Sequence, residues 1–148
     1  MAKSKSRTPE SARYSVGIDL GTTNCALARA SLDAEAGAGS IDVLSLAQLV
    51  EAGEVADRTL LPSFAYIVGD FDFPAGSLRL PWGDDNRPPQ IVGELARKRG
   101  AETPMRLVAS AKSWLSYAGA NRTAPILPWG SPDEVAKVSP VAASALYL

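Results

Sequence analysis

The sequence has no histidine and a single cysteine, Cys25, among its 148 residues. The lack of histidine removes the commonest general base and the usual zinc ligand, and one cysteine excludes an internal disulfide or a multi-cysteine metal site. There is no apolar run near the roughly 20 residues that would span a bilayer, and no apolar secretory signal. We therefore expect a soluble, cytoplasmic protein without membrane contact, whose chemistry uses carboxylates, lysine, hydroxyls or backbone amides.

An excess of charge of one sign is also lacking, because 15 basic and 16 acidic side chains give a formal net charge of -1. These charges are mixed along the chain, so nucleic acid is not an expected partner. Apolar residues make up 46% and charged residues 21%, a balance typical of one globular domain with a sizeable core. Residues 1–13 combine basic residues with Ser, Thr and Pro, which predicts a disordered tail before a domain over residues 14–148.

Alternating apolar and β-branched residues predict strands in the first half of the chain. Residues 14–20 form the first strand, Gly21-Thr22-Thr23 break it, and residues 24–30 predict an antiparallel return, although their alanines also permit a helix. The same signals predict strands over residues 41–46 and 61–68, a loop over 31–40, no clear element over 47–57, and a long surface insertion over 70–90.

Helical signals follow from Ile91 onward. Residues 94–99 are good helix formers, and Gly100 is expected to cap their helix. Apolar side chains at helical spacing predict a second helix over residues 107–117, followed by a loop over 121–132. A third helix begins after Pro140, and its uncapped apolar end indicates a fragment of a longer polypeptide.

The most informative segment is GIDLGTTN, from Gly17 to Asn24. Gly21 lets the backbone approach a ligand closely, and consecutive amides in such a turn form an anion-binding concavity. The hydroxyls of Thr22 and Thr23 add donors, and Asp19 can bind magnesium directly or through its water shell. Taken as an arbitrary short match, however, the segment favours a simple hairpin with no ligand.

The segment GIDLGTTN resembles the first phosphate motif of the superfamily of actin, sugar kinases and DnaK-type chaperones, and it is close to verbatim for the chaperones. Four further segments resemble chaperone motifs in the same order: DRTLLPSF at 57–64 (N-R-T-T-P-S-Y), IVGELA at 91–96 (L-I-G-D-A-A), AKSWL at 111–115 (A-K-R-L-I), and Ser139-Pro140 (Y-P-E-E). The sugar kinases share only the first motif. From Tyr14 to its end the chain is therefore similar to the amino-terminal part of the ATPase domain of the DnaK, or heat-shock protein 70, family.

This resemblance implies an α/β fold, namely part of the ribonuclease-H-like lobe of an actin-like ATPase followed by a small helical and strand subdomain. It implies that the intact protein binds ATP or ADP with Mg²⁺, hydrolyses ATP, and acts on client peptides together with co-chaperones. The phosphates would be cradled by four residues: Gly21, Thr22, Thr23 and Asn24. The family's remaining site segments lie beyond Leu148, so residues 1–148 alone are expected to bind nucleotide weakly at best.

By the same resemblance, Asp19 and Lys112 are the catalytic candidates. Asp19 would hold magnesium through water, and Lys112 would position the attacking water and the terminal phosphate, where a cation offsets developing charge. By its pattern alone, Lys112 is an ordinary solvated lysine on a short amphipathic helix. Two other functions stay open: a carbohydrate kinase of the same superfamily, and a scaffold that keeps the fold without catalysis.

Two features depart from the family pattern. Cys25 stands where the family has serine, at a position where close packing is expected. The insertion over residues 70–90 is longer and more aromatic than usual. Its Phe71, Phe73 and Trp82 indicate either ordinary loop packing or a surface for a partner.

Overall fold

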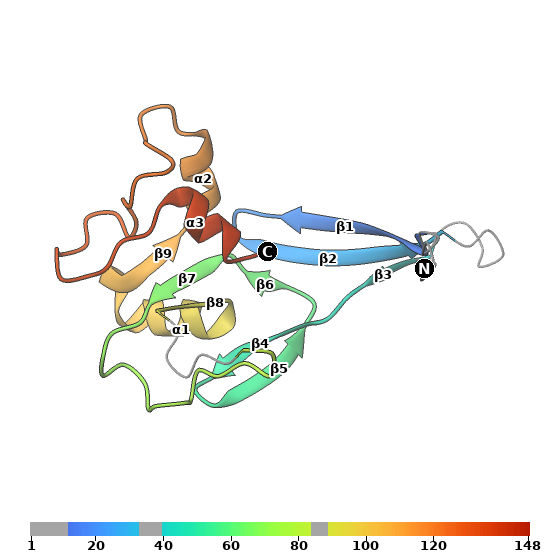
Figure 1. Cartoon of the computed structure of the whole chain (residues 1–148), viewed down its shortest axis with the longest axis horizontal. Coiled ribbons are helices and arrows are strands. Elements are labelled where there is room, and N and C mark those ends of the chain that lie inside the picture. Colours follow the sequence, from blue (N-terminus) through green and yellow to red (C-terminus); the bar gives the residue numbers. More distant parts are fainter. Residues whose placement is uncertain (1–11, 33–39, 84–88) are drawn as a thin grey trace, which may run out of the picture.

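The computed structural model describes residues 12–32, 40–83 and 89–148, and these residues form a mixed α/β structure with antiparallel sheets (Figure 1). The strands are β1 (Tyr14–Leu20), β2 (Asn24–Ser31), β3 (Ile41–Val43), β4 (Leu46–Glu51), β5 (Glu54–Arg58), β6 (Leu61–Pro62), β7 (Phe64–Ile67), β8 (Gln90–Val92) and β9 (Leu107–Ala109). The helices are α1 (Glu94–Glu102), the 3-10 helix η2 (Pro104–Arg106), α2 (Ala111–Ser116) and α3 (Pro140–Ala145).

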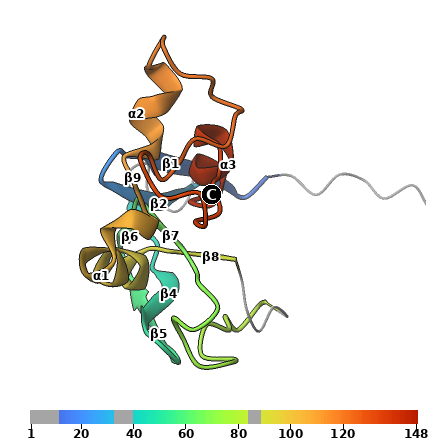
Figure 2. The ribbon, with the colours of Figure 1, turned by 90° about the vertical axis from the view of Figure 1, so that its left-hand side faces the viewer.

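Strands β1 and β2 form a long hairpin that projects from the rest of the molecule (Figure 1). Its pairing runs from Tyr14 opposite Ser31 to Leu20 opposite Cys25, and β3 and β6 pair with other parts of β2. The turn end of the hairpin lies against the body of the protein, beside α2 and α3, as Figures 1 and 2 both show. The hairpin therefore carries its turn to the point where several other elements meet.

The body is built around the sheet β8-β7-β9, in which β7 is the central strand. Alternate residues of β7 point to opposite faces, because side chains alternate along a strand. Ala65 and Ile67 enter a core with α3 and the segment before it, whereas Tyr66 enters a second core with α1. Because both faces are covered, the sheet forms a rigid base for the segments that precede and follow β7.

The hairpin β4–β5 is tied to α1 by polar side chains. Gln48, which is buried, accepts a hydrogen bond from the Glu94 amide at 2.9 Å and donates one to the Leu60 carbonyl at 2.9 Å. It thereby satisfies one of the free amides at the start of α1. Lys98 donates to the Val50 carbonyl at 3.0 Å, which fixes the same hairpin further along the helix.

The strand predictions for residues 14–20 and 24–30 are confirmed, including the antiparallel return. The predicted strand over 41–46 is instead divided between two strands, because β3 ends at Val43 and β4 begins at Leu46. The unassigned stretch over 47–57 forms most of the β4–β5 hairpin. The predicted strand over 61–68 is interrupted at Ser63, whose amide bonds to the β1–β2 turn rather than to a neighbouring strand.

The structure corrects the helix predictions at four points. Helix α1 continues through Gly100 to Glu102, and the glycine provides space for Leu107 rather than a cap. The predicted helix over 107–117 begins as strand β9, and α2 starts only after Ser110, whose φ of 54° breaks the chain direction. Residue Ile91 belongs to strand β8, and the third helix ends at Ala145, before the last residues.

The insertion over residues 70–90 is only partly a surface feature. Leu78 is buried in the core beside α1, and Phe73 and Leu80 pack against that core. Phe71 and Trp82 are exposed. The predicted tail over 1–13, the loop over 31–40 and this insertion each lie wholly or partly outside the described residues. No helix in the described ranges is long and apolar enough to cross a membrane.

Candidate phosphate-binding site

The turn between β1 and β2 is held in a close bend that requires glycine at position 21. A Cβ atom added to Gly21 would lie 2.1 Å from the carbonyl oxygen of Asn24. This distance is far below a normal carbon–oxygen contact, so the backbone could not adopt the same bend with a side chain present. The sequence prediction of a tight glycine turn is confirmed at this position.

Three carbonyl groups in and beside this turn are bound by side chains or backbone from elsewhere in the fold. The Ser63 hydroxyl donates to the Gly21 carbonyl at 2.8 Å, and the Ser63 amide donates to the Thr23 carbonyl at 2.9 Å. The ammonium group of Lys112 donates to the Leu20 carbonyl. The electronegative side of the turn is therefore occupied by donors from the protein.

The hydrogen-bond donors of the turn, in contrast to its carbonyl groups, have no partner among the described residues. The amide groups of Gly21, Thr22 and Thr23 donate to no acceptor among the residues that the structure describes. Thr22 and Thr23 are exposed, and their hydroxyls likewise have no partner within the described part of the chain. A backbone whose carbonyls are occupied while its amides stay free has the polarity of an anion-binding concavity.

Lys112 comes to this turn from a distant part of the chain. It is the second residue of α2 and lies 92 positions after Leu20, whose carbonyl it binds. The preceding residue, Ala111, is buried in the core with Cys25 and anchors the start of α2 there. Lys112 itself is exposed, so its positive charge stands beside the free amides of the turn without being buried.

Asp19 lies one residue before the end of β1, opposite Ala26, and its carboxylate is exposed. It makes no hydrogen bond or ion pair with any described residue. The described residues contain no group of three or more side chains that could hold a metal ion. One carboxylate still fits Mg²⁺, because this ion is commonly held by one or two carboxylates together with phosphates and water.

Asn24, the last of the expected phosphate-binding residues, is half-buried and begins β2 opposite Pro62 of β6. The structure thus brings Asp19, Gly21, Thr22, Thr23 and Asn24 together in one short bend, with Lys112 beside it. All of the residues expected to bind phosphate or magnesium are therefore neighbours, although they come from two distant segments.

Ser63 also contributes to this bend, although the sequence pattern predicts no role for it. It is buried, and its hydroxyl lies 3.3 Å from the Cys25 thiol as well as bonding to Gly21. Cys25 is itself buried in the core, in accord with the packing role expected for it. The available signal was the segment DRTLLPSF, which resembles a chaperone motif and ends just after Ser63.

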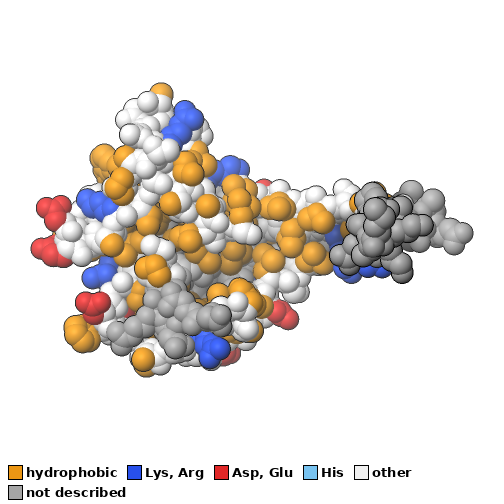
Figure 3. Space-filling model, in the orientation of Figure 1, with side chains coloured by type: hydrophobic (Ala, Val, Ile, Leu, Met, Phe, Trp, Pro, Cys, Tyr) orange, Lys and Arg blue, Asp and Glu red, His pale blue; other side chains and the backbone are white. Residues whose placement is uncertain are grey.

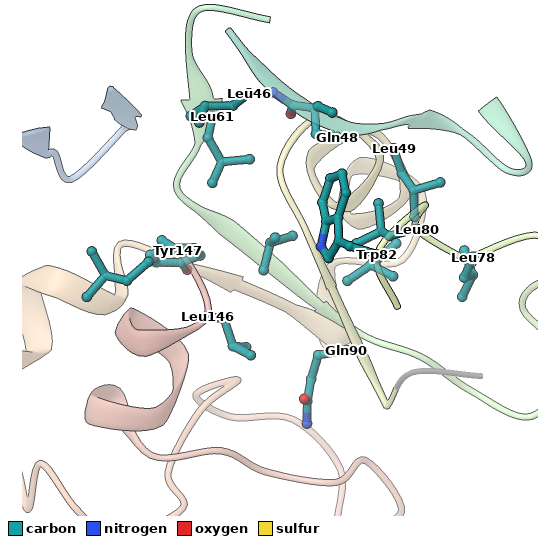
Figure 4. Close-up of a pocket in the computed structure, with 14 residues that line it drawn as sticks. Leu46, Gln48, Leu49, Leu61, Leu78, Leu80, Trp82, Gln90, Leu146 and Tyr147 are labelled. Carbon is teal, nitrogen blue, oxygen red and sulfur yellow. The ribbon is translucent and has the colours of Figure 1, made fainter. Parts of the chain in front are cut away.

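The bend lies at the protein surface, where Thr22, Thr23 and Lys112 are exposed. An apolar hollow of about 340 Å³ lies elsewhere, between β4, β8, the segment containing Leu78 and the last residues of the chain (Figure 4). Half of its lining residues are leucine, and none of them is a charged residue that could bind phosphate.

The chain was compared with protein-family models, with curated protein sequences and with solved structures, and none of the three comparisons gave a match.

Proposed function

We propose that this chain is a phosphate-binding portion of an ATPase, in which the bend from Asp19 to Asn24 holds the phosphates of Mg-ATP. The observation that carries this proposal is the polarity of the bend. Ser63 and Lys112 occupy its carbonyls, while its amides and hydroxyls remain free to donate. Free donors beside a lysine ammonium group would stabilise the negative charge of a polyphosphate.

Within that class, we assign the chain to the amino-terminal part of the nucleotide-binding domain of a DnaK-type chaperone. Three segments support this assignment together: GIDLGTTN, DRTLLPSF and AKSWL each resemble a motif of that family. Residues from all three meet at the bend, through the hydrogen bonds of Ser63 and Lys112. If the three resemblances had arisen by chance, they would not explain why residues of all three segments meet at the bend.

The proposed roles follow from the positions of the groups. The amides of the bend and the hydroxyls of Thr22 and Thr23 orient the phosphates, and Asp19 would hold the magnesium ion. When bound, magnesium neutralises charge on the phosphate oxygens. Lys112 would turn from the Leu20 carbonyl toward the terminal phosphate and the attacking water. Breaking that hydrogen bond costs little, because the lysine is exposed and water can replace its partner.

The intact protein would need further segments to enclose the nucleotide. The projecting hairpin sheet carries exposed apolar side chains on both faces: Val16 and Ile18 lie on one face, and Ile41 and Val43 lie on the other. Each of these four side chains is more than half exposed. Figure 3 shows apolar side chains along this arm. Among the described strands, β1 pairs with β2 alone, so one edge of the sheet is open. Segments that cover these surfaces would supply the other walls of the site.

The test is ATP turnover by the protein that carries this chain, with the variant Lys112→Ala. We expect phosphate release to fall by about a hundredfold or more, as for the loss of other transition-state donors. The control Arg97→Ala removes an exposed cation from α1 and should leave turnover unchanged. Equal turnover in the wild type and Lys112→Ala would remove the role assigned to this residue.

The same assay separates the two other functions. Transfer of phosphate to a carbohydrate instead of water would identify a sugar kinase that shares the bend. An absence of turnover together with retained folding would favour a scaffold. Tight, stoichiometric ATP binding by residues 1–148 alone, measured by calorimetry, would contradict the view that further segments complete the site.

A further inference from the structure

Three aromatic side chains, one in α2 and two in the segment after it, form a cluster on the surface. The ring centroids of Trp114 and Trp129 are 5.1 Å apart, and Trp114 meets Tyr117 edge to face at 5.9 Å. Tyr117 is 60% exposed and Trp129 is 70% exposed. Because both exposed rings contact Trp114, the three form a contiguous apolar patch, which on soluble proteins commonly marks a binding surface.

The aromatic cluster lines a hollow of about 590 Å³, which also includes Asn121 and Ile126. The segment that forms its walls is held by its own hydrogen bonds. The Ala120 amide donates to the Tyr117 carbonyl at 3.2 Å, and the Ile126 amide donates to the Val138 carbonyl at 3.1 Å. The hollow is thus preformed, which lowers the entropy lost when a ligand binds.

The polar groups around the hollow are mainly donors. The oxygen of the Asn121 side chain already accepts from the Thr123 amide at 3.1 Å and from its hydroxyl at 2.9 Å. The amide nitrogen of Asn121 remains available, as do the two indole N–H groups of the cluster, which have no partner among the described residues. A ligand that offers acceptors and few donors matches this arrangement.

The charge beside the hollow is positive. Lys137 lines an adjoining hollow that shares Ile126 and Trp129 with the first, and Arg122 directly follows Asn121. Neither cation forms an ion pair within the described residues. Asp133 and Glu134 are the only acidic residues after residue 106, and neither lines these two hollows.

We infer that this aromatic cluster binds an extended, proline-rich protein segment with acidic residues at its flank. Proline rings pack well between aromatic side chains, and a polyproline helix presents carbonyl acceptors without the matching N–H donors. The acidic flank would lie near Arg122 and Lys137. This surface is separate from the Asp19–Asn24 bend, and the inference does not depend on nucleotide binding.

The test uses a short fluorescein-labelled proline peptide with an acidic end, titrated with the protein and followed by fluorescence anisotropy. We expect saturable binding that weakens about tenfold or more in Trp129→Ala, since exposed aromatic anchors dominate such interfaces. The matched control Trp82→Ala removes an exposed indole that lines a different hollow, and this variant should bind as the wild type does. Thermal unfolding of each variant shows whether the fold is retained.

Gly119 offers a second variant that keeps all three rings. A Cβ atom at this position would lie 3.1 Å from the Tyr117 ring and hydroxyl, so in Gly119→Ala the ring must shift by a few tenths of an ångström. Weaker binding in Gly119→Ala with unchanged stability supports a shaped site. Three results would each overturn the inference: no binding by the wild type, equal binding by Trp129→Ala, or equal binding of a peptide in which alanines replace the prolines. Tighter binding of a single-stranded oligonucleotide than of the peptide would also overturn it.

Discussion

Replacing Gly21 with alanine tests whether the close bend is essential to the site. The added Cβ would meet the Asn24 carbonyl oxygen at 2.1 Å, whereas such a contact is normally about 3.3 Å. The bend must therefore open by about 1.2 Å, and the obstacle is backbone, which cannot rotate away as a side chain can. Gly21→Ala thus changes the geometry of the turn itself.

The cost can be worked out from the hydrogen bonds that hold the turn. Ser63 bonds to the Gly21 and Thr23 carbonyls at 2.8 and 2.9 Å, and a shift of this size carries both beyond hydrogen-bonding distance. Each bond contributes about 0.5–1.5 kcal/mol, so the free energy of unfolding should fall by about 1–3 kcal/mol. In thermal unfolding this corresponds to a decrease in Tm of about 3–9 °C.

The matched control is Gly17→Ala, four residues earlier on β1. A Cβ atom at Gly17 has nothing within 4 Å, so we expect a change below about 0.5 kcal/mol. The assay is chemical denaturation of both variants beside the wild type. If Gly21→Ala and Gly17→Ala have the same stability, the bend does not need glycine and the reasoning is refuted.

Three further substitutions test other parts of the account. Ser63→Ala leaves the Gly21 carbonyl without its donor and should lower the free energy of unfolding by about 1–3 kcal/mol in urea denaturation; a change below about 0.5 kcal/mol would contradict the role of Ser63. Gly100→Ala gains about 1 kcal/mol of helix propensity but places a Cβ atom 2.3 Å from the Leu107 side chain. The substitution should therefore destabilise the wild-type protein and stabilise a Leu107→Ala variant. Additive effects of the two substitutions in this double-mutant cycle would argue against the contact. Burial raises the pKa of Tyr147 above its ordinary value of 10.0, so the folded state holds this proton more tightly and the associated stability is lost as pH rises above 10. Tyr147→Phe should reduce that loss of stability at alkaline pH. At neutral pH it should stabilise the protein by about 1 kcal/mol, because the buried hydroxyl has no partner among the described residues. If the loss of stability above pH 10 is the same in Tyr147→Phe, Tyr147 does not cause it.

The first hairpin could be predicted from sequence because its signals are local. Residues 14–20 alternate in a way that suits a strand, and Gly21 breaks the strand where the turn forms. The resemblance to a chaperone motif pointed to Lys112, but nothing in its local pattern distinguishes it from a surface lysine. Its position beside the turn depends on packing between segments that are 92 residues apart.

The wrong predictions arise from tertiary contacts, which rules based on local sequence do not include. Gly100 has the sequence position of a helix cap, yet it lies within α1 because Leu107 packs against it. The stretch after residue 106 has helical spacing, but Leu107–Ala109 pairs with β7 and becomes a strand. Ser63 interrupts a continuous apolar run because it bonds to the first turn. In each case tertiary contact outweighs local propensity.

The most direct test of the central claim is an NMR titration of the protein with Mg-ATP, following the backbone amide resonances. We expect shifts at Gly21, Thr22 and Thr23 that saturate with weak affinity, because these amides have no acceptor within the described structure. The same titration of Lys112→Ala should give smaller shifts at a given ATP concentration. Unchanged amide resonances for the bend at saturating Mg-ATP, or shifts confined to another surface, would contradict the assignment of this turn as a phosphate site.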